Sequence, residues 1–530
     1  MPKVLVSDPI AEAGIEILRR IPNTTVDAKL GLKPEELKAI IGQYDALAVR
    51  SETKVTADIL ASAEKMQIIG RAGVGVDNID VGMATRRGIV VVNSPEGNTL
   101  AAAELAVALL LALARKIPQA DASLRAGKWE RKKFVGTEIY GKTVGVIGLG
   151  KIGRNVAQRM KSFETAVVAF DPFATPEGAR RIGVELVTLD VLLERSDFIT
   201  IHVPLNDATR GMIGATQIAR MKDGARIINC ARGGIVDETA LAEAIQSGKL
   251  DGVAFDVFSK EPPEADNPLL ALSQNVVTPH LGASTEEAQV NVAIDIAEQI
   301  SDVLQGKSAR SAVNLPALSA EELTQVSPYL YLARQIGSLH TQLAAGQGLT
   351  VESVEIIFNG DFSSMPTESI TRATLQGIMS PMLEDPVNVV NAPILAEARG
   401  IKVTESFSKT SHEHTCLLSV RAKTAKGERT ICGTAYGQDA RIVHIDGYHV
   451  DIIPNGHMIV TQHNDRPGII GKVGTLLGEN RINIGGMHVG RESVGNRAIM
   501  VLLLDEPISE ALLGQICAME GMETAQLVTL

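Results

Sequence analysis

A glycine-rich segment in the second quarter of the chain constrains the fold more than any other stretch. Residues 144–147 form a short apolar run that is typical of a buried parallel strand. Gly148, Gly150 and Gly153 follow in the pattern Gly-x-Gly-x-x-Gly, and residues 154–162 then show a helical pattern. In this motif the first glycine allows a tight turn, the second lets a pyrophosphate approach the backbone, and the third lets helix and strand pack closely. The phosphates would bind free N–H groups at the positive end of the helix.

An acidic residue follows at the distance that a dinucleotide site requires. A second apolar strand, residues 166–170, leads to Asp171, which is 18 positions after Gly153. The acid that binds the adenosine ribose hydroxyls is expected about 20 residues after the glycines. A carboxylate there repels a 2′-phosphate, so the pattern favours NAD over NADP. A lone Gly-x-Gly-x-x-Gly could be a tight turn in any α/β protein, but strand, glycines, helix, strand and acid in this order predict a dinucleotide site.

Composition limits the classes of protein to consider. A chain of 530 residues is long enough for three or four domains with cores of their own. Its net charge of −11 argues against nucleic acid or an anionic membrane as the main partner. The four cysteines include no Cys-x-x-Cys pair and predict no disulfide framework. The start shows no signal peptide, and the longest apolar run, residues 105–114, is far shorter than the ~20 residues that cross a bilayer. We therefore expect a cytoplasmic protein.

The region before the glycine motif predicts a sheet domain of its own. Short apolar strands alternate with amphipathic helices over residues 3–92, which is typical of a doubly wound parallel sheet. Arg50 follows one predicted strand, and residues 72–77 follow the next. Ligands gather at the carboxyl ends of parallel strands, so both loops are candidate binding segments. For Arg50 a solvated surface position is an equal alternative.

A long helix and a basic run come next. Asn98 is a suitable N-cap for a helix over residues 99–115, which is apolar on nearly every face. Such a helix must be covered on all sides, in part by another subunit. Residues 129–133 then form the densest basic run in the chain, for which a solvated loop is the alternative.

Four charged residues follow later strands of the dinucleotide pattern. Arg232, Asp256, Glu261 and His280 each come at or just after the carboxyl end of a predicted strand, at the edge where the glycines place the cofactor. Hydride transfer from an alcohol needs a base for the hydroxyl proton, and histidine has a suitable pKa of about 6.5. A carboxylate on the far nitrogen of such a histidine fixes its tautomer, and an arginine holds a substrate carboxylate with its planar fork. Each residue alone has a structural explanation, but together they predict an active site.

These segments resemble the D-isomer-specific 2-hydroxyacid dehydrogenases. The similarity rests on the glycine motif, Asn229-Cys-Ala-Arg-Gly-Gly234, Glu261-Pro-Pro and Pro279-His-Leu-Gly-Ala-Ser-Thr285. Gly73-Val-Gly-Val-Asp-Asn-Ile-Asp80 and Gly127-Lys-Trp-Glu-Arg-Lys-Lys-Phe134 are similar to the phosphoglycerate dehydrogenase branch of that family. The resemblance implies NAD as cofactor and D-3-phosphoglycerate as substrate, on the route to serine.

The resemblance also implies roles for individual residues. His280 would be the acid/base, Glu261 its partner, and Arg232 the group that orients the substrate. The cofactor contacts implied are Gly148, Gly150, Lys151, Ile152, Gly153, Asp171, Val203, Cys230, Ala231, Arg232, Asp256, His280, Gly282 and Ala283. The substrate contacts implied are Arg50, Val74, Gly75 and Arg131, the last from a neighbouring subunit of a dimer or tetramer.

The C-terminal third resembles two regulatory domains. Residues 317–455 are similar to the intervening domain of the long phosphoglycerate dehydrogenases. Residues 456–530 show the order βαββαβ of a ferredoxin-like fold and resemble an ACT domain, a class that pairs side by side and binds an amino acid at the junction. L-Serine would bind there near Asp465 and Asn483, although His463 departs from the aromatic residue expected in serine-sensitive members. His412, His414 and Cys416 on one strand face would be a conceivable metal site, but no further ligand is identifiable and we expect none.

The complete prediction is an α/β chain of four domains. A discontinuous substrate domain (1–97 and 286–316) and a Rossmann NAD domain (98–285) are expected to have doubly wound parallel sheets. An α+β intervening domain (317–455) and an ACT domain (456–530) follow. Two alternatives remain: the same chemistry on glyoxylate, hydroxypyruvate or another 2-hydroxy acid, and a dinucleotide-sensing binding protein of the same fold. The basic residues and the regulatory tail count against them.

Overall fold

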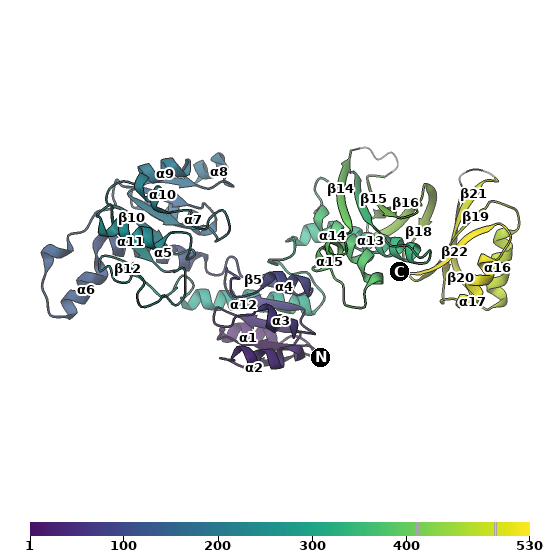
Figure 1. Cartoon of the computed structure of the whole chain (residues 1–530), viewed down its shortest axis with the longest axis horizontal. Helices are drawn as coiled ribbons and strands as arrows, with labels where there is room; N and C mark the ends of the chain where they lie inside the picture. Colours follow the sequence, from purple (N-terminus) through teal and green to yellow (C-terminus); the bar gives the residue numbers. More distant parts are fainter. Residues whose placement is uncertain (410–413, 492, 494) are drawn as a thin grey trace.

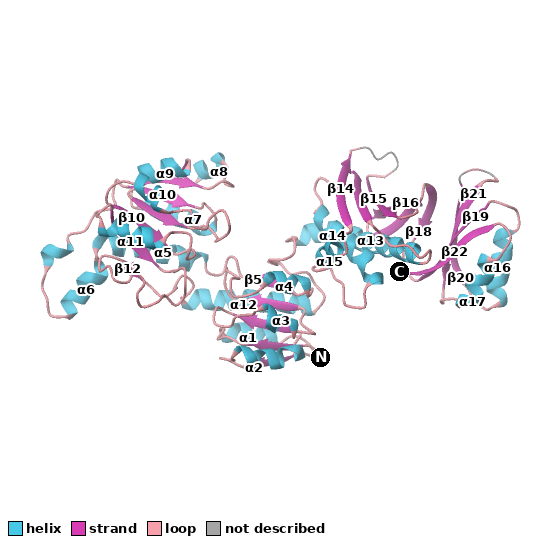
Figure 2. Ribbon diagram, viewed as in Figure 1, coloured by secondary structure: helices cyan, strands magenta, loops and turns pink. Residues whose placement is uncertain are grey.

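The computed structural model describes residues 1–409, 414–491, 493 and 495–530. These residues form four sheets, which lie in four bodies along an elongated molecule (Figure 1). The seven-stranded sheet is at one end and the four-stranded sheet at the other. The five-stranded sheet, which contains the N-terminus, lies between the seven-stranded and the six-stranded sheets. The predicted fold class is confirmed, since two parallel α/β sheets are followed by two sheets of mixed and antiparallel strands (Figure 2).

The first sheet is entirely parallel, in the order β2-β1-β3-β4-β5. Alternate residues of its apolar strands point to opposite faces, so helices cover both sides. One face packs on α1 and α12, the other on α2, α3 and α4. The bounds are β1 Lys3–Val6, α1 Glu12–Arg19, β2 Thr25–Ala28, α2 Pro34–Ile40, η1 Ile41–Gln43, β3 Ala46–Val49, α3 Ala57–Ala61, β4 Ile68–Arg71, α4 Val81–Arg86, β5 Val90–Asn93 and α12 Glu286–Leu304.

The chain leaves this body after β5 and returns to it through α12. After α12, Ala312 forms an isolated antiparallel bridge with Val92, and the N–H of Val313 donates to the carbonyl of Val91 at 2.7 Å. Residues 308–315 therefore reach the edge of the first sheet as predicted, but through a short bridge and not a full strand.

The second sheet is the Rossmann sheet, with seven parallel strands in the order β12-β11-β10-β9-β6-β7-β8. The topological switch lies between β6 and β9, where open α/β sheets bind ligands. The bounds are α5 Thr99–Arg115, α6 Ile117–Arg125, η2 Arg131–Phe134, β6 Thr143–Ile147, α7 Lys151–Ser162, β7 Ala166–Phe170, α8 Pro176–Arg181, β8 Glu185–Leu186, α9 Leu189–Arg195, β9 Phe198–Ile201, α10 Ala215–Arg220, β10 Ala225–Asn229, α11 Glu238–Gln246, β11 Leu250–Phe255 and β12 Val276–Val277.

The helix α5 begins where predicted, but its capping differs. Asn98 occupies the N-cap position without a side-chain hydrogen bond to the helix, and its Oδ1 is buried without a partner in the described chain. The prediction of a capping asparagine was wrong in this respect. One side of α5 is buried against the Rossmann sheet, whereas none of the residues of α6 is buried.

The third sheet has the order β14-β13-β15-β16-β17-β18, with β13 and β14 parallel and the other pairs antiparallel. The sequence prediction missed its edge strand β18, Tyr448–Ile452. The other bounds are α13 Ala320–Ala345, β13 Ser353–Gly360, α14 Thr367–Met379, η3 Ser380–Met382, α15 Ala392–Ala398, β14 Lys402–Ser408, β15 Cys416–Thr424, β16 Gly427–Tyr436 and β17 Asp439–Ile445.

The fourth sheet is antiparallel, in the order β20-β21-β19-β22, and both of its helices lie on one face (Figure 2). Its other face joins the buried cluster of the third body, because Met458, Val460, Ile499, Val501 and Val528 belong to the same cluster as Ile442, Ile445, Val450 and Ile452. The two bodies contact each other where β22 meets α13 and where β20 meets β18. The bounds are β19 His457–Asn464, α16 Ile469–Glu479, β20 Ile484–Arg491, β21 Arg497–Leu504, α17 Glu510–Cys517 and β22 Met522–Thr529. No helix among the described residues has the length and apolar content needed to cross a membrane.

Candidate active site

The glycine loop between β6 and α7 has the shape that a pyrophosphate needs. Gly148 has a φ of +91°, and a Cβ there would lie 2.5 Å from the carbonyl oxygen of His202. A Cβ on Gly153 would lie 1.9 Å from the carbonyl oxygen of Gly148, so only glycine lets α7 pack this closely. A Cβ on Gly150, the N-cap of α7, would meet nothing within 4 Å, and no side chain caps the helix. The free N–H groups of α7 therefore face open space, which fits a dinucleotide phosphate.

The acid predicted to bind the ribose lies beside this loop. Asp171 follows β7, and its two carboxylate oxygens accept hydrogen bonds from the N–H groups of Leu149 (2.7 Å) and Phe173 (2.8 Å). These bonds fix the carboxylate at the carboxyl edge of the sheet, next to the glycines. The residues present thus fit NAD.

Three further predicted cofactor contacts also lie at or near the loop. A Cβ on Gly148 would approach the Val203 side chain to 2.7 Å, which places Val203 directly against the turn. Lys151, in the first turn of α7, forms an ion pair of 2.5 Å with Glu96 in the segment between the first sheet and α5. Ile152 packs at the border of the Rossmann core.

His280 and Glu261 form a direct pair. The His280 Nδ1 atom lies 2.7 Å from Glu261 Oε2, and both side chains are partly exposed. Although burial acts to raise the pKa of Glu261, the hydrogen bond and charge of His280 hold it below its usual value. An ionised Glu261 accepts the Nδ1 proton, which leaves the Nε2 atom as the basic nitrogen. Nε2 has no hydrogen bond within the described part of the chain.

Asp256 supports the loop that carries His280. His280 has a φ of +56°, a left-handed conformation that is unfavourable for a side chain of its size. The fully buried carboxylate of Asp256 accepts from the N–H groups of Leu281 (2.7 Å) and Gly282 (2.9 Å) and from the Thr278 hydroxyl (2.6 Å). Burial raises the pKa of Asp256. Ala283 follows directly in this loop, whose bonds to Asp256 hold His280 at the sheet edge.

Arg232 lies in the loop after β10, between the two parallel sheets. Its Nε donates to Asp77 Oδ2 at 3.1 Å, and Asp77 belongs to the loop after β4 in the first sheet. A Cβ on Gly75 would lie 1.9 Å from Arg232 Nη2, so the guanidinium rests on the Gly75 backbone. Asn229 fixes the loop by accepting from the Ala231 N–H and donating to the Arg232 carbonyl. Cys230, in the same loop, has a thiol whose pKa is raised by burial and by Asp256.

The predicted substrate residues of the first sheet lie on adjacent loops. Arg50 follows β3, with its N–H bonded to Asp8 and its carbonyl bonded to Asn78. Val74 follows β4, and its carbonyl accepts from Asn93. Because β3 and β4 are neighbouring parallel strands, these loops share one sheet edge, and the loop after β4 contacts Arg232 through Asp77 and Gly75.

Sequence reasoning missed a further arginine at this edge. Arg71 is the last residue of β4, and its Nε is buried without a hydrogen-bond partner in the described chain. Burial, and then the charge of Arg232, lower the pKa of Arg71 to about 10. A charged residue that ends an otherwise apolar strand, two positions before the glycine loop, was the signal available in the sequence.

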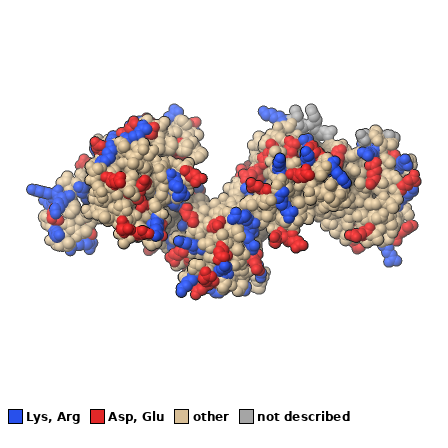
Figure 3. Space-filling view, viewed as in Figure 1, with Lys and Arg blue, Asp and Glu red and all other residues tan. Residues whose placement is uncertain are grey.

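Arg131 does not join these residues within one chain. It lies in η2, after the exposed helix α6, which projects from the end of the molecule farthest from the fourth sheet (Figure 1). Basic side chains gather at this end, whereas both signs of charge are mixed over the rest of the visible face (Figure 3).

The proposed effector residues also lie apart in one chain. Asp465 follows β19 and contacts the N–H of Gly495 and the guanidinium of Arg491. Asn483 precedes β20 and donates to Asp505. Both β19 and β20 pair antiparallel with β21. His457, the first residue of β19, and Ile484, the first residue of β20, both pair with Leu504. The two residues are therefore at opposite ends of the sheet, about 25 Å apart by the rise of an extended strand.

The conceivable metal site finds no support in the described chain. His412 lies outside the described residues, and β15 begins only at Cys416, so His414 does not share a strand face with Cys416. That expectation was wrong for these two residues. No cluster of three or more potential ligands occurs among the described residues.

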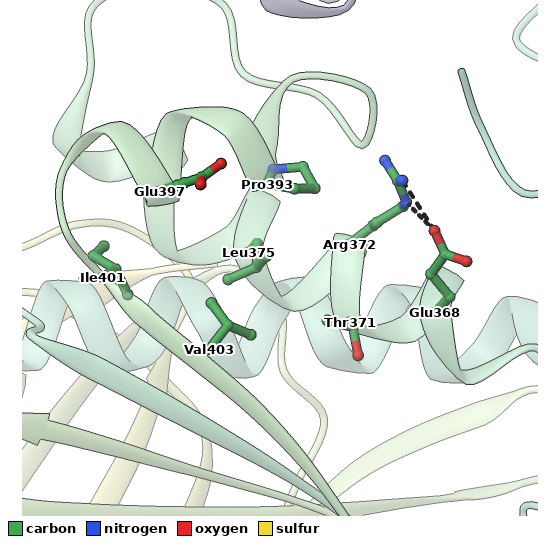
Figure 4. Close-up of a pocket in the computed structure, with 8 residues that line it drawn as sticks. All are labelled: Glu368, Thr371, Arg372, Leu375, Pro393, Glu397, Ile401 and Val403. Carbon is green, nitrogen blue, oxygen red and sulfur yellow. Dashed lines mark hydrogen bonds and ion pairs between the residues drawn. The ribbon is translucent and has the colours of Figure 1, made fainter. Parts of the chain in front are cut away.

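A pocket of about 350 Å³ lies in the third body, away from this chemistry (Figure 4). Apolar side chains form much of its wall, and Arg372 bonds Glu368 at its rim at 2.9 Å. Its lining residues are Glu368, Thr371, Arg372, Leu375, Pro393, Glu397, Ile401 and Val403. None of the predicted site residues lines it.

Comparison with known proteins agrees with this geometry. Residues 107–282 match the NAD-binding domain of D-isomer-specific 2-hydroxyacid dehydrogenases, residues 325–446 the D-3-phosphoglycerate dehydrogenase intervening domain, and residues 457–521 the ACT domain. The D-3-phosphoglycerate dehydrogenase of Archaeoglobus fulgidus is 47% identical over the whole of both chains. That of Synechocystis is 47% identical over all of this chain and 95% of its own. The crystal structure of the TT0316 protein from Thermus thermophilus, 32% identical, covers 59% of this chain and 99% of its own with a TM-score of 0.55.

The resemblance predicted from the motifs is thereby confirmed, as is NAD as the cofactor. Similarity at this level, over the full length and through all three matched domains, shows that the chain belongs to the D-3-phosphoglycerate dehydrogenases, NAD-dependent oxidoreductases of the D-isomer-specific 2-hydroxyacid dehydrogenase family.

Proposed function

We propose that this chain oxidises D-3-phosphoglycerate to 3-phosphohydroxypyruvate with NAD, the first step of L-serine biosynthesis. The observation that carries the proposal is the His280–Glu261 pair at the same sheet edge as Arg232 and the glycine loop. Full-length similarity to enzymes of that name supports the choice of substrate.

His280 takes the proton of the substrate hydroxyl on Nε2, because Glu261 already holds the proton on Nδ1. Glu261 then stabilises the imidazolium that forms. NAD, held by the glycine loop and Asp171, would supply the acceptor for the hydride of the substrate carbon. In the reverse direction His280 returns its proton to the carbonyl oxygen.

Arg232 orients the substrate for this transfer. Its Nε donates to Asp77 and its Nη1 donates one proton to the Ala231 carbonyl, so the remaining N–H groups of the two terminal nitrogens are the ones that can bind a carboxylate. Held between the two sheets, the guanidinium can fix the substrate carboxylate while the adjacent carbon faces the cofactor.

The phosphate of the substrate requires further cations. Arg50 and Arg71 lie at the edge of the first sheet, and Arg71, whose buried Nε has no partner among the described residues, is suited to a dianion. Arg131 would come from a second chain, because it lies far from the cleft of its own. The exposed Ile117, Leu124, Trp129 and Tyr140 around α6 support such an assembly, since they form an uncovered apolar surface.

The direct experiment is to measure NADH formation with a panel of 2-hydroxy acids at alkaline pH. We expect D-3-phosphoglycerate to have the highest kcat/KM, and His280→Asn to remove the activity. A higher value for glycerate, glyoxylate or hydroxypyruvate in the corresponding direction would favour a different 2-hydroxy acid. Binding of NAD without turnover of any substrate would favour a sensor.

L-Serine is the effector that we propose for the fourth body. An amino acid can bind Asp465 through its ammonium and Asn483 through its carboxylate, but only if the two residues come from different chains. Antiparallel pairing of the edge strand β20 with β20 of a second chain would bring them together. Serine should inhibit the full-length enzyme, and Asp465→Ala should raise the concentration required while leaving KM for phosphoglycerate unchanged.

A further inference from the structure

Asp77 is the acidic residue that holds Arg232, and it belongs to the opposite body. Its Oδ2 accepts the Nε proton of Arg232 at 3.1 Å, across 155 positions of sequence. The Asp77 side chain is 66% exposed and that of Arg232 only 26%, so the carboxylate lies at the surface while the arginine is largely covered.

The loop that carries Asp77 is rigid. Asn78 Nδ2 donates to the carbonyls of Arg50 and Thr53, both at 2.7 Å, and Asn93 Nδ2 donates to the carbonyl of Val74. The next acid, Asp80, caps α4 through the Met83 N–H. Each neighbour of Asp77 is thus fixed to its own body, which leaves the Asp77 carboxylate as the group that reaches across.

The pair also determines which atoms of Arg232 the substrate can use. Asp77 occupies Nε, and Nη1 donates to the Ala231 carbonyl at 2.6 Å. Nη2 rests on Gly75, where even a methyl group would collide with it. The guanidinium is therefore held on three sides and presents its terminal edge in one orientation.

The negative charge of Asp77 should weaken the binding of an anionic substrate, although its hydrogen bond orients Arg232. Asp77 lies near Arg71 as well as Arg232, and its charge raises the pKa of Arg71 against the larger effects of burial and of Arg232. A carboxylate among cations that await an anionic substrate weakens the attraction for that substrate. A residue of this kind favours orientation at the expense of affinity.

We propose that Asp77 is a positioning residue for catalysis: it fixes Arg232 across the cleft in the orientation that aligns the substrate for hydride transfer. The proposal rests on the proposed function, since it assigns Arg232 to the substrate carboxylate. Through this hydrogen bond, the first body contributes to catalysis by orienting an arginine of the second body.

The test measures kcat and KM for phosphoglycerate in Asp77→Ala and Asp77→Asn, with Glu64→Ala as a control at an exposed acid of the same body. Asp77→Ala should lower kcat about tenfold to a hundredfold, the usual effect of a misplaced substrate. KM for phosphoglycerate should stay the same or fall, because a negative charge is removed, and KM for NAD should not change. Asp77→Asn keeps an oxygen acceptor for Nε and should retain most of kcat. Glu64→Ala should match the wild type.

A double-mutant cycle separates positioning from a structural role. If Asp77 acts through Arg232, adding Asp77→Ala to Arg232→Lys should lower kcat no further, within about twofold. An equal loss in both backgrounds, or an unchanged kcat in Asp77→Ala, would overturn the proposal. If Asp77→Ala melts below the assay temperature, Asp77→Ser replaces it in the cycle, with the same loss of kcat expected. A wild type that does not oxidise phosphoglycerate would instead refute the proposed function, and the same variants would then be assayed with the best acid of the panel.

Discussion

The two halves of this molecule join their sheets in different ways. The first two sheets have separate cores: the residues buried on the faces of the first sheet pack with its own helices, and those of the Rossmann sheet do the same. The contacts between these bodies include the polar Arg232–Asp77 pair. The third and fourth sheets instead share one apolar cluster that runs from Val326 to Val528.

The difference indicates what each half can do. Two bodies with separate cores and charged loops between them can open and close around a ligand at low cost, which suits a cleft that must admit and release substrate. Two sheets with a common core cannot separate without exposing apolar surface. We therefore expect the third body to share any motion of the fourth body, and Asn388 of the third body donates to the carbonyl of Gly88 in the first body at 2.7 Å.

The largest expected effect is a loss of kcat, which should follow from substitutions in the active site of the first half and not from those in the core of the second half. His280→Asn should lower kcat by about 10²–10⁴, the usual contribution of general acid–base catalysis. Val501→Ala, in the shared core of the second half, should leave kcat within about threefold. Steady-state kinetics of both variants decide this, and a His280→Asn enzyme with near-normal turnover would place the base elsewhere.

A substitution in the shared core should lower the stability of the third and fourth sheets together. Ile452, at the end of β18, is 1% exposed and belongs to the cluster that both sheets share, whereas its neighbour Ile453 is 45% exposed. Ile452→Ala should cost about 2–5 kcal/mol, and Ile453→Ala less than about 0.5. Hydrogen exchange should then show protection falling together in both sheets. Loss confined to residues 416–452 would mean that the two sheets are independent.

The sequence predicted the fold of each body better than the contacts between bodies. Strands and helices follow local patterns, so the apolar runs of β6, β7 and β10 and the glycine loop could be recognised directly. His280 and Glu261 were recognisable because each follows a strand at one sheet edge. That the third and fourth sheets share a core depends on which apolar residues face each other, and alternation along a strand does not identify the partner sheet.

The residues missed have the same explanation. Arg71 is part of a short apolar strand, and its lack of a partner becomes visible only when its surroundings are known. The edge strand β18 is short and half polar, so its pattern is weak. Asp77 lay within a recognised motif, but its bond to Arg232 joins two bodies that are far apart in sequence.

A buried histidine should make the second half sensitive to acid. His340, in α13, is 2% exposed and bonded through Nε2 to the Val420 carbonyl, and burial lowers its pKa to about 3. Between about pH 6.5 and 3 the unfolded chain binds a proton that the folded chain does not, so the free energy of unfolding falls as the pH decreases. The slope from this group is at most about 1.4 kcal/mol per pH unit.

Chemical denaturation from pH 7 to pH 4.5 checks this prediction. His340→Gln removes the titrating group and should flatten the pH dependence, whatever its effect on stability at pH 7. Thr341→Ser, at the next buried position of the same helix, removes no titrating group and is the control, which should leave the slope unchanged. An identical slope in His340→Gln and the wild type would contradict the assignment.

The smallest effect concerns the polar contacts that accompany the shared core. The Gln342 amide donates to the Thr529 carbonyl at 2.7 Å and accepts from its N–H at 2.9 Å, which joins α13 to the edge strand β22. Gln342→Ala should cost about 1–2 kcal/mol, and Gln347→Ala, just after the helix, less. Thermal unfolding measures both. Equal values would mean that the Gln342–Thr529 contact contributes nothing measurable to joining the two bodies.

The most direct test of the comparison measures distances on both sides of the molecule. Spin labels at Glu52 and Asp207 report across the cleft between the first two bodies, and labels at Lys423 and Glu510 report across the last two; all four positions are exposed. Cys517, the exposed native thiol, is replaced by serine in both double variants. On addition of NAD and D-3-phosphoglycerate, the account predicts a shorter and narrower distance distribution for the first pair and no change for the second. A fixed first pair, or a second pair that moves as much as the first, would contradict it.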